Sequence, residues 1–325
     1  MREIEYREAI REAITEEMDS DKKVFLIGED IGVYQGAFKV YKGLLDKYGS
    51  GRVINTPISE AAIIGAAIGA ALTGYRPIAE IMFIDFAALA MDQIANQAAK
   101  IHFMSGGSID VPLVIRTQGG VGKGLSAQHS QSLESWFYHI PGLKVAMPST
   151  AYDAKGLLKT AVRDNGPVIF IEHKMIYPIK GPVPEKQYTI PFGKADIKRK
   201  GKDITILAYG NMLLKSLESA EELGREGVNC EVIDPRTLVP LDIDAIIDSV
   251  KKTGRLVIIS EACRRGSVAS DISARVTEKV FEYLKAPVKI VAGLNTPIAY
   301  NFALEQASIP QKADILEAVK TIIKK

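Results

Sequence analysis

Apolar residues along this chain fall into two patterns that alternate over its length. Short runs rich in β-branched residues predict strands at residues 24–28, 52–56, 76–82, 111–117, 143–147 and 167–173. Near the N-terminus, Ile4, Ile10 and Ile14 fall close to helical spacing instead. Alternation of strand and helix patterns is typical of βα units that build a mainly parallel sheet.

The alternation pauses in the middle of the chain and then restarts. Residues 174–200 contain Pro178, Pro182, Pro184 and Pro191, a composition that favours an extended linker. Further strands are predicted at residues 203–210, 229–238, 255–262 and 288–293. We therefore predict an α/β fold with two α/β domains in series, at residues 1–187 and 203–325, joined by a linker at 188–202.

The composition is typical of a globular protein and argues against some classes of binding partner. Of 325 residues, 47% are apolar and 25% are charged, and 41 basic residues nearly balance 39 acidic ones, leaving a net charge of +2. So small a net charge argues against nucleic acid or an anionic membrane as the partner. The apolar stretch Ala61–Leu72 is shorter than the ~20 residues needed to cross a bilayer, so it predicts a buried helix.

The N-terminal residues and the cysteines both favour a cytoplasmic location. Charges run throughout MREIEYREAIREAITEEM, and no apolar signal core interrupts them. Cys230 and Cys263 stand in unrelated contexts, which is more typical of buried thiols than of a disulfide or a metal site. We expect a reducing compartment.

A glycine-rich segment, GGVGKG at residues 119–124, raises the question of phosphate binding. A P-loop needs Ser or Thr directly after its Gly-Lys pair, whereas Gly124 follows Lys123 here. Residues 122–127 match a loose dinucleotide pattern, but no acidic residue ends a second strand about 20 residues later. The segment therefore indicates a flexible loop more than a nucleotide site.

Two titratable residues stand out because of their surroundings. His129 follows the glycine segment among small polar residues, a position suited to proton transfer to a ligand, although a structural histidine is the default interpretation. His102, His139 and His173 lie inside helix or strand patterns and are interpreted as structural. Glu60 opens the run AAIIGAAIGAAL, where it either stabilises a helix N-terminus or acts as a carboxyl with raised proton affinity in an apolar pocket.

Long blocks of sequence carry a family resemblance over nearly the whole chain. They are NTPISEAAIIGAAIG, RPIAEIMFIDFAALAMDQIANQAAK, GLSAQHSQSLESWFYHIPGLKV, EVIDPRTLVPLD and PVKIVAG. In this order they resemble the β subunit of the thiamine diphosphate-dependent component of 2-oxo acid dehydrogenase complexes, of the pyruvate or acetoin type. The resemblance implies a pyrimidine-binding domain followed by a transketolase C-terminal-like domain.

The resemblance also implies a shared active site. Glu60 matches the glutamate that bonds the N1′ nitrogen of the thiamine pyrimidine, Met82 and Phe86 match positions that pack around that ring, and His129 matches an active-site histidine. No Gly-Asp-Gly segment, the usual element for holding Mg²⁺ on the diphosphate, occurs in the sequence. We expect an α subunit to hold the Mg²⁺, in an α2β2 heterotetramer with a β–β contact that serves a lipoyl-bearing acyltransferase core.

A second ion is implied at TAVRDNGPV. This segment resembles a loop that holds potassium through backbone carbonyls, which would involve Leu113, Ala161, Val162 and Asp164. Gly166 stands where Asn occurs in some members of the family, so a simple loop that ends a helix is the alternative.

Other functions remain open from the sequence alone. The substrate could be pyruvate, acetoin or a branched-chain 2-oxo acid, and half of a split transketolase shares the same order of domains. QHSQSLESW argues against transketolase. A non-catalytic assembly subunit is a further alternative, which the joint presence of Glu60, Phe86 and His129 disfavours.

Overall fold

The computed structural model describes residues 1–324 and divides into two compact units. The first unit joins Met1–Gly119 to Trp136–Phe192, and the second joins Gly120–Ser135 to the residues from Gly193 onward. Residues 120–135 thus pack with the C-terminal part of the chain, although they lie far before the predicted linker. Both units are α/β, which confirms the predicted fold class.

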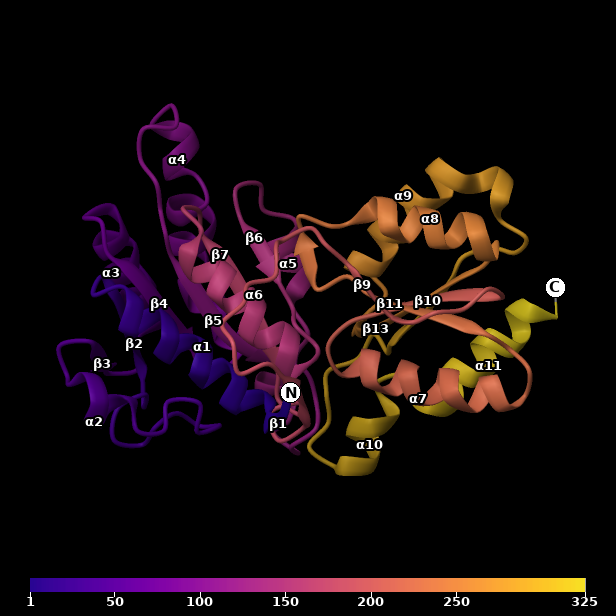
Figure 1. Ribbon diagram of the computed structural model, residues 1–325, viewed down its shortest axis with the longest axis horizontal. Helices are drawn as coiled ribbons and strands as arrows, with labels where there is room; N and C mark the ends of the chain where they lie inside the picture. The colour runs from indigo at the N-terminus through magenta and orange to yellow at the C-terminus, as the bar shows by residue number, and fades with distance from the viewer. Residues whose placement is uncertain (325) are drawn as a thin grey trace. The chain divides into compact units, whose positions relative to one another are not determined.

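A parallel sheet forms the centre of the first unit (Figure 1). Its strands are hydrogen-bonded in the order β6–β7–β5–β4–β2–β3. They are β2 (Val24–Glu29), β3 (Val53–Thr56), β4 (Arg76–Ile81), β5 (Val114–Gly119), β6 (Lys144–Ala146) and β7 (Val168–His173). Each coincides with a predicted apolar run. β2, β5 and β7 are buried along their whole length, and strands covered on both faces are mostly apolar.

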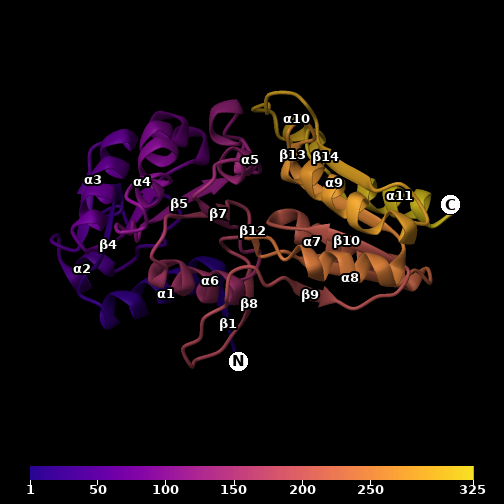
Figure 2. The ribbon, with the colours of Figure 1, turned by 90° about the horizontal axis from the view of Figure 1, so that it is seen from above.

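Helices cover this sheet on both sides. Figure 2 shows α1 (Tyr6–Ser20) beside α6 (Ala151–Arg163), and these two helices pack against each other. The predicted buried helix is α3 (Glu60–Leu72), which packs against the 3-10 helix η1 (Ile84–Ala90) and the π-helical η2 (Gln93–Ala98). Shorter elements are α2 (Leu44–Tyr48), α4 (Ile101–Met104) and α5 (Glu134–Tyr138), whereas η3 (Ala127–His129) belongs to the second unit.

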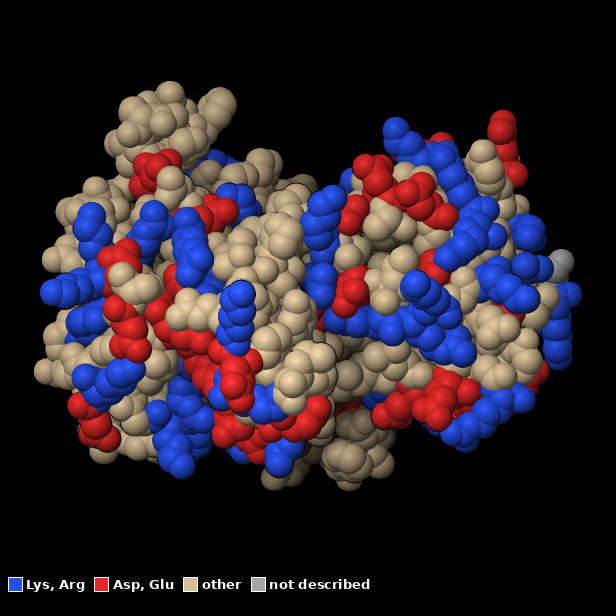
Figure 3. Space-filling model, viewed as in Figure 1, with Lys and Arg blue, Asp and Glu red and all other residues tan. Residues whose placement is uncertain are grey.

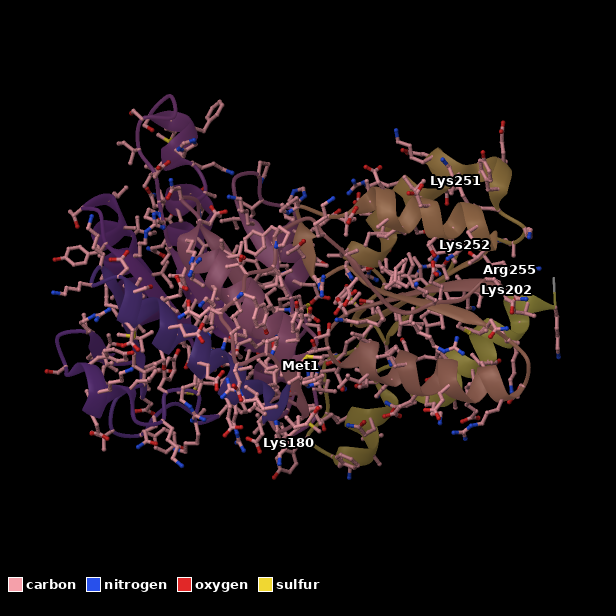
Figure 4. The ribbon with its side chains drawn as sticks, viewed as in Figure 1. Met1, Lys180, Lys202, Lys251, Lys252 and Arg255 are labelled. Carbon is pink, nitrogen blue, oxygen red and sulfur yellow. The ribbon has the colours of Figure 1, made fainter. Side chains whose placement is uncertain are left out.

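Two short strands border the first unit. β1 (Arg2–Glu5) pairs antiparallel with β8 (Lys180–Val183), and Glu5 lies opposite Lys180 in the register. Figure 4 labels Met1 and Lys180, which mark this pairing. The beginning of the chain is thereby attached to the proline-rich stretch that follows β7.

The second unit contains a smaller sheet with helices on both faces. Its strands run in the order β14–β13–β10–β11–β9, parallel except for the edge strand β9. They are β9 (Asp196–Arg199), β10 (Ile204–Ala208), β11 (Cys230–Asp234), β13 (Leu256–Cys263) and β14 (Lys289–Gly293). The short β12 (Thr237–Val239) follows β11 in the chain but is not a strand of this sheet. β9 lies inside the stretch that was expected to be a linker.

Four helices sandwich this second sheet (Figures 1 and 2). α7 (Asn211–Arg225) and α11 (Lys312–Ile323) pack together, as do α8 (Ile243–Thr253) and α9 (Val268–Val280). The remaining elements are η4 (Phe281–Tyr283) and α10 (Phe302–Ala307). Buried Ile204, Ile206, Val232, Val257 and Ile259 form the core between the layers.

Charged side chains of both signs are interspersed on the face shown in Figure 3, in keeping with the net charge of +2. Figure 4 labels Lys202, Lys251, Lys252 and Arg255, and Lys252 is paired with Glu231. These basic residues precede β10 and β13, so they lie at the amino edge of the second sheet. Within residues 1–324, no helix has the length and apolar character needed to span a bilayer.

Candidate functional site

Glu60 lies at the first position of α3, next to the carboxyl edge of the parallel sheet. Its side chain is only 7% exposed, and the helix that follows buries Ile63, Ile64 and Ala67. Ser59 occupies the N-cap position, but its side chain makes no capping hydrogen bond. The Glu60 carboxyl therefore lies at the positive end of a helix dipole, on a helix whose buried face is apolar.

A second acidic residue, Glu29, ends β2 at the same edge of the sheet. Loss of solvation raises the pKa of Glu29, and the nearby charges of Glu60, Asp30 and Glu80 raise it further. Its Oε2 is buried without a hydrogen-bond partner among residues 1–324, as is Oγ1 of Thr56 at the end of β3. Buried polar atoms of this kind normally have a partner, so this edge is suited to a polar ligand.

Met82 and Phe86, which the family resemblance places around the pyrimidine ring, follow the carboxyl end of β4 in the sequence. Met82 directly follows β4, and Phe86 belongs to η1, which packs against α3. Both side chains are half-buried. The rings of Phe83 and Phe86 meet edge to face, with centroids 6.1 Å apart and planes at 82°. Aromatic and thioether side chains with partly open surfaces can pack on a heteroaromatic ring.

Behind the edge, the sheet contains a buried charge network centred on Arg116. Its Nε and Nη2 donate to the two carboxylate oxygens of Glu172, each at 2.7 Å, and Nη1 donates to Glu80 at 2.9 Å. The hydroxyl of Tyr41 donates to Glu80 at 2.7 Å, and that of Tyr177 donates to Glu172 at 2.5 Å. Burial raises the pKa of Glu80, and the charge of Arg116 offsets only part of this increase, so the pKa stays above its ordinary value.

His129 belongs to the second unit. It ends η3 and is half-buried, and its backbone N–H donates to Ser126 O at 3.3 Å. A pocket of about 500 Å³ lies beside it, lined by Gln128, Ser130 and residues that include Cys263 and Asn295. The structure therefore places Glu60, Met82 and Phe86 in one unit and His129 in the other.

The carbonyls implied to hold potassium lie around the end of α6. Arg76 Nη1 donates to the carbonyl oxygens of Val162, at 3.1 Å, and Asp164, at 3.0 Å. The carbonyls of Leu113 and Ala161 each accept one backbone hydrogen bond. Every carbonyl oxygen has two lone pairs, so each of the four can still accept another partner. The negative end of the α6 dipole favours a cation here, and Arg76 already supplies one.

Several charged residues at this site were not identified from the sequence. Glu29, Glu80, Arg116 and Glu172 all interrupt apolar strand runs, and a charge inside a buried strand is the signal that marks them. Among residues 1–324, no group of three or more His, Cys, Asp and Glu side chains is arranged to hold a metal ion. Both cysteines are free thiols.

Comparison with known proteins first defines the class. Residues 2–180 match the transketolase pyrimidine-binding domain, and residues 193–315 match the transketolase C-terminal domain. Among solved structures, a split-gene transketolase described as an inactive β4 tetramer has the same fold, with a TM-score of 0.81 and 24% identity over 99% of this chain and 98% of that one. The chain thus consists of the two domain types found together in transketolase-like proteins.

Curated relatives define the family. The β subunit of acetoin:2,6-dichlorophenolindophenol oxidoreductase from Cupriavidus necator is 49% identical over 99% of this chain and 98% of its own length. The mitochondrial pyruvate dehydrogenase E1 component subunit beta-2 of Oryza sativa subsp. japonica is 47% identical over 98% of this chain and 86% of its own, and the E1 β subunit of Rickettsia bellii is 47% identical over 98% of each. The chain belongs to the family of pyruvate and acetoin dehydrogenase E1 β subunits, which implies an α subunit as its partner.

Proposed function

We propose that this β subunit, together with its α subunit, cleaves pyruvate or acetoin and transfers the resulting acyl group to the lipoyl arm of an acyltransferase core. The observation that carries the proposal is the buried Glu60 carboxyl at the start of α3, beside Glu29 at the carboxyl edge of the sheet. The relatives named for pyruvate and acetoin support this substrate class. Branched-chain 2-oxo acids remain the alternative.

The residues at the sheet edge fit the pyrimidine end of thiamine diphosphate. Glu60 would share a proton with the N1′ ring nitrogen, while Met82 and Phe86 would pack against the ring. The raised pKa of Glu29 means that this neighbour keeps a proton to higher pH, which limits repulsion between the two carboxyls. When bound, thiamine diphosphate would supply a nucleophilic carbon and accept the electrons released by bond cleavage.

His129 is assigned the task of moving a proton or orienting the substrate during acyl transfer. An imidazole can donate and accept hydrogen bonds and protons through its two ring nitrogens, which suits it to both parts of this task. Its place after a glycine-rich loop, among small polar residues, supports the assignment.

The diphosphate end of the cofactor requires a metal that we assign to the α subunit. Mg²⁺ binds phosphates together with carboxylate or amide oxygens. We propose an α2β2 heterotetramer with a β–β contact. Large exposed apolar side chains in the first unit support burial by partners, namely Val33 at 88%, Ile58 at 79%, Phe103 at 85% and Met104 at 77% exposure.

Potassium is proposed at the end of α6, held by carbonyls of Leu113, Ala161, Val162 and Asp164. The test compares the thermal midpoint of the assembled enzyme in potassium chloride and in choline chloride at equal ionic strength. A higher midpoint in potassium is expected for the wild type. Equal midpoints would show that Arg76 alone neutralises these carbonyls.

The function itself is tested by reduction of an artificial dye in the presence of thiamine diphosphate and Mg²⁺. The chain alone is compared with the chain plus its α subunit, across pyruvate, acetoin and branched-chain 2-oxo acids. Activity only in the mixture, with pyruvate or acetoin preferred, is the expected result. Equal activity of the isolated chain would overturn the shared site, and a preference for branched substrates would overturn the substrate assignment.

A further inference from the structure

Two buried carboxyl groups of the second unit bind the backbone of the glycine-rich segment. The N–H of Val121 donates to Oε1 of Glu261 at 2.7 Å. The N–H groups of Gly122 and Gly124 both donate to Oε1 of Glu305, at 2.9 and 3.3 Å. The two acceptors lie 140 and more residues further along the chain, at the end of β13 and in α10. These bonds attach the segment to the C-terminal part of the fold.

The glycines explain why these N–H groups converge. Gly120, Gly122 and Gly124 have φ values of 83°, 103° and 61°, in the left-handed region that L side chains rarely adopt. Successive N–H groups in such a segment form a concave nest that favours an anion. In many proteins the anion is a phosphate. Here carboxyl groups of the same chain accept the N–H groups of Val121, Gly122 and Gly124.

Glu305 makes its hydrogen bonds to the glycine-rich segment from a fully buried position. Its side chain is fully buried at 0% exposure, and its Oε1 accepts both glycine N–H groups. Its Oε2 accepts no hydrogen bond from residues 1–324. Burying a carboxyl is costly unless it is hydrogen-bonded, and bonds from N–H groups to a carboxylate are stronger than neutral ones. The segment and Glu305 therefore depend on each other for their positions.

The same segment carries His129 between two further attachments. The Gly120 N–H donates to Gln131 O at 3.0 Å and closes the loop at its base. Beyond it, Glu134 accepts a hydrogen bond from the Tyr209 hydroxyl at 3.2 Å. His129 thus lies on a closed loop whose first half is held by Glu261 and Glu305.

We propose that Glu305, assisted by Glu261, is a positioning residue for His129. It holds the glycine nest so that the imidazole keeps one place during acyl transfer. This inference rests on the proposed role of His129, and it adds a residue that lies far from His129 in the sequence. It predicts that loss of the Glu305 acceptor loosens the loop and slows the step that needs His129.

Limited proteolysis measures the loop directly. Lys123 is exposed and stands between Gly122 and Gly124, the two residues whose N–H groups Glu305 holds. Trypsin should cleave after Lys123 about tenfold faster or more in Glu305→Leu, because two charge-assisted hydrogen bonds are lost. Glu305→Gln keeps an acceptor oxygen and should stay near the wild type. Glu317→Leu, at an exposed carboxylate of the same unit, is the matched control.

The effect of a loosened loop on catalysis is measured by acyl transfer to lipoyl domains by the assembled αβ enzyme. For Glu305→Leu we expect kcat to fall about tenfold or more, with the apparent KM for thiamine diphosphate unchanged and rescue by Glu305→Gln. If Glu305→Leu folds poorly by circular dichroism, Glu305→Asp replaces it. Asp keeps the charge but withdraws the oxygens by one methylene, so it should behave like Leu.

The outcomes separate this inference from the proposed function. Unchanged cleavage and unchanged acyl transfer in a folded Glu305→Leu or Glu305→Asp enzyme would overturn the positioning role. Faster cleavage with undiminished acyl transfer would overturn it too, provided that His129→Ala is impaired. If His129→Ala is itself unimpaired, the assigned role of His129 fails, and the inference that rests on it fails as well.

Discussion

Replacing Arg116 with Met is expected to destabilise the first unit by about 3–5 kcal/mol, the usual cost of breaking a buried ion pair. Arg116 is fully buried and donates three hydrogen bonds of 2.7–2.9 Å to Glu172 and Glu80. Met has a similar length and is apolar. The substitution therefore leaves little cavity, and its main effect is to leave two buried carboxyls without their shared counter-charge.

Urea unfolding of the full chain provides the assay. The fluorescence of Trp136, the one tryptophan in the sequence, reports on the first unit, to which Arg116 also belongs. With a slope of about 2 kcal/mol per molar urea, the expected loss lowers the midpoint by about 1.5–2.5 M. Arg116→Lys keeps the charge but not the paired geometry, so it should lose less, about 1.5–3 kcal/mol. The control Arg2→Met removes a surface ion pair and should cost less than about 1 kcal/mol.

The pH dependence checks the cause. Burial already raises the pKa of Glu80, and loss of the Arg116 charge would raise it further in the folded state. A carboxyl whose folded pKa exceeds its unfolded pKa binds more protons when folded, so stability falls as pH rises through that interval. The deficit of Arg116→Met should therefore be larger at pH 8 than at pH 5. A deficit below about 1 kcal/mol, or one independent of pH, would refute the electrostatic explanation.

Three further predictions concern the site itself. Glu60→Gln should preserve the αβ assembly, checked by gel filtration, but lower dye reduction by about 100-fold or more, because an amide cannot supply the proton; retained turnover would contradict its role. His129→Ala should impair lipoyl acylation more than binding of thiamine diphosphate, measured by fluorescence titration, and equal acylation would contradict that role. Glu29→Gln removes a carboxyl with a raised pKa, whose ionisation lowers stability as pH rises. It should therefore raise the urea midpoint more at pH 8 than at pH 4, and a gain independent of pH would argue against this cause.

The sequence predicted those elements whose burial leaves an apolar run of consecutive residues. Strands such as β2 and β7 are buried on both faces, so most of their positions are apolar and the run is visible in the sequence. β9 was not predicted, because its sequence, DIKR, has no apolar pattern. It becomes a strand by pairing with β11 at the edge of the sheet, and a sequence shows neither the partner nor the order of strands.

The sequence likewise predicted only those site residues that are marked by their neighbours in the chain. Glu60 stands out because a lone carboxyl precedes an apolar helix, which is a local signal. The Arg116 network is not local. Arg116 lies opposite Glu80 in the register of β4 and β5, and Gln118 lies opposite Glu172 in that of β5 and β7. Only the order and register of the parallel strands bring these charges together.

The glycine-rich segment shows that a local sequence pattern can leave the role of that segment undetermined. The sequence was interpreted as a flexible loop, whereas the structure gives Gly120, Gly122 and Gly124 positive φ values and holds the segment by hydrogen bonds to Glu261 and Glu305. What fills a nest is decided by whichever anion the fold brings to it. Here that anion is Glu305, more than 180 residues away, so the same local pattern that serves phosphate elsewhere holds a loop in place. If the proteolysis and acyl-transfer assays agree, the histidine owes its position to a residue that no local motif could reveal.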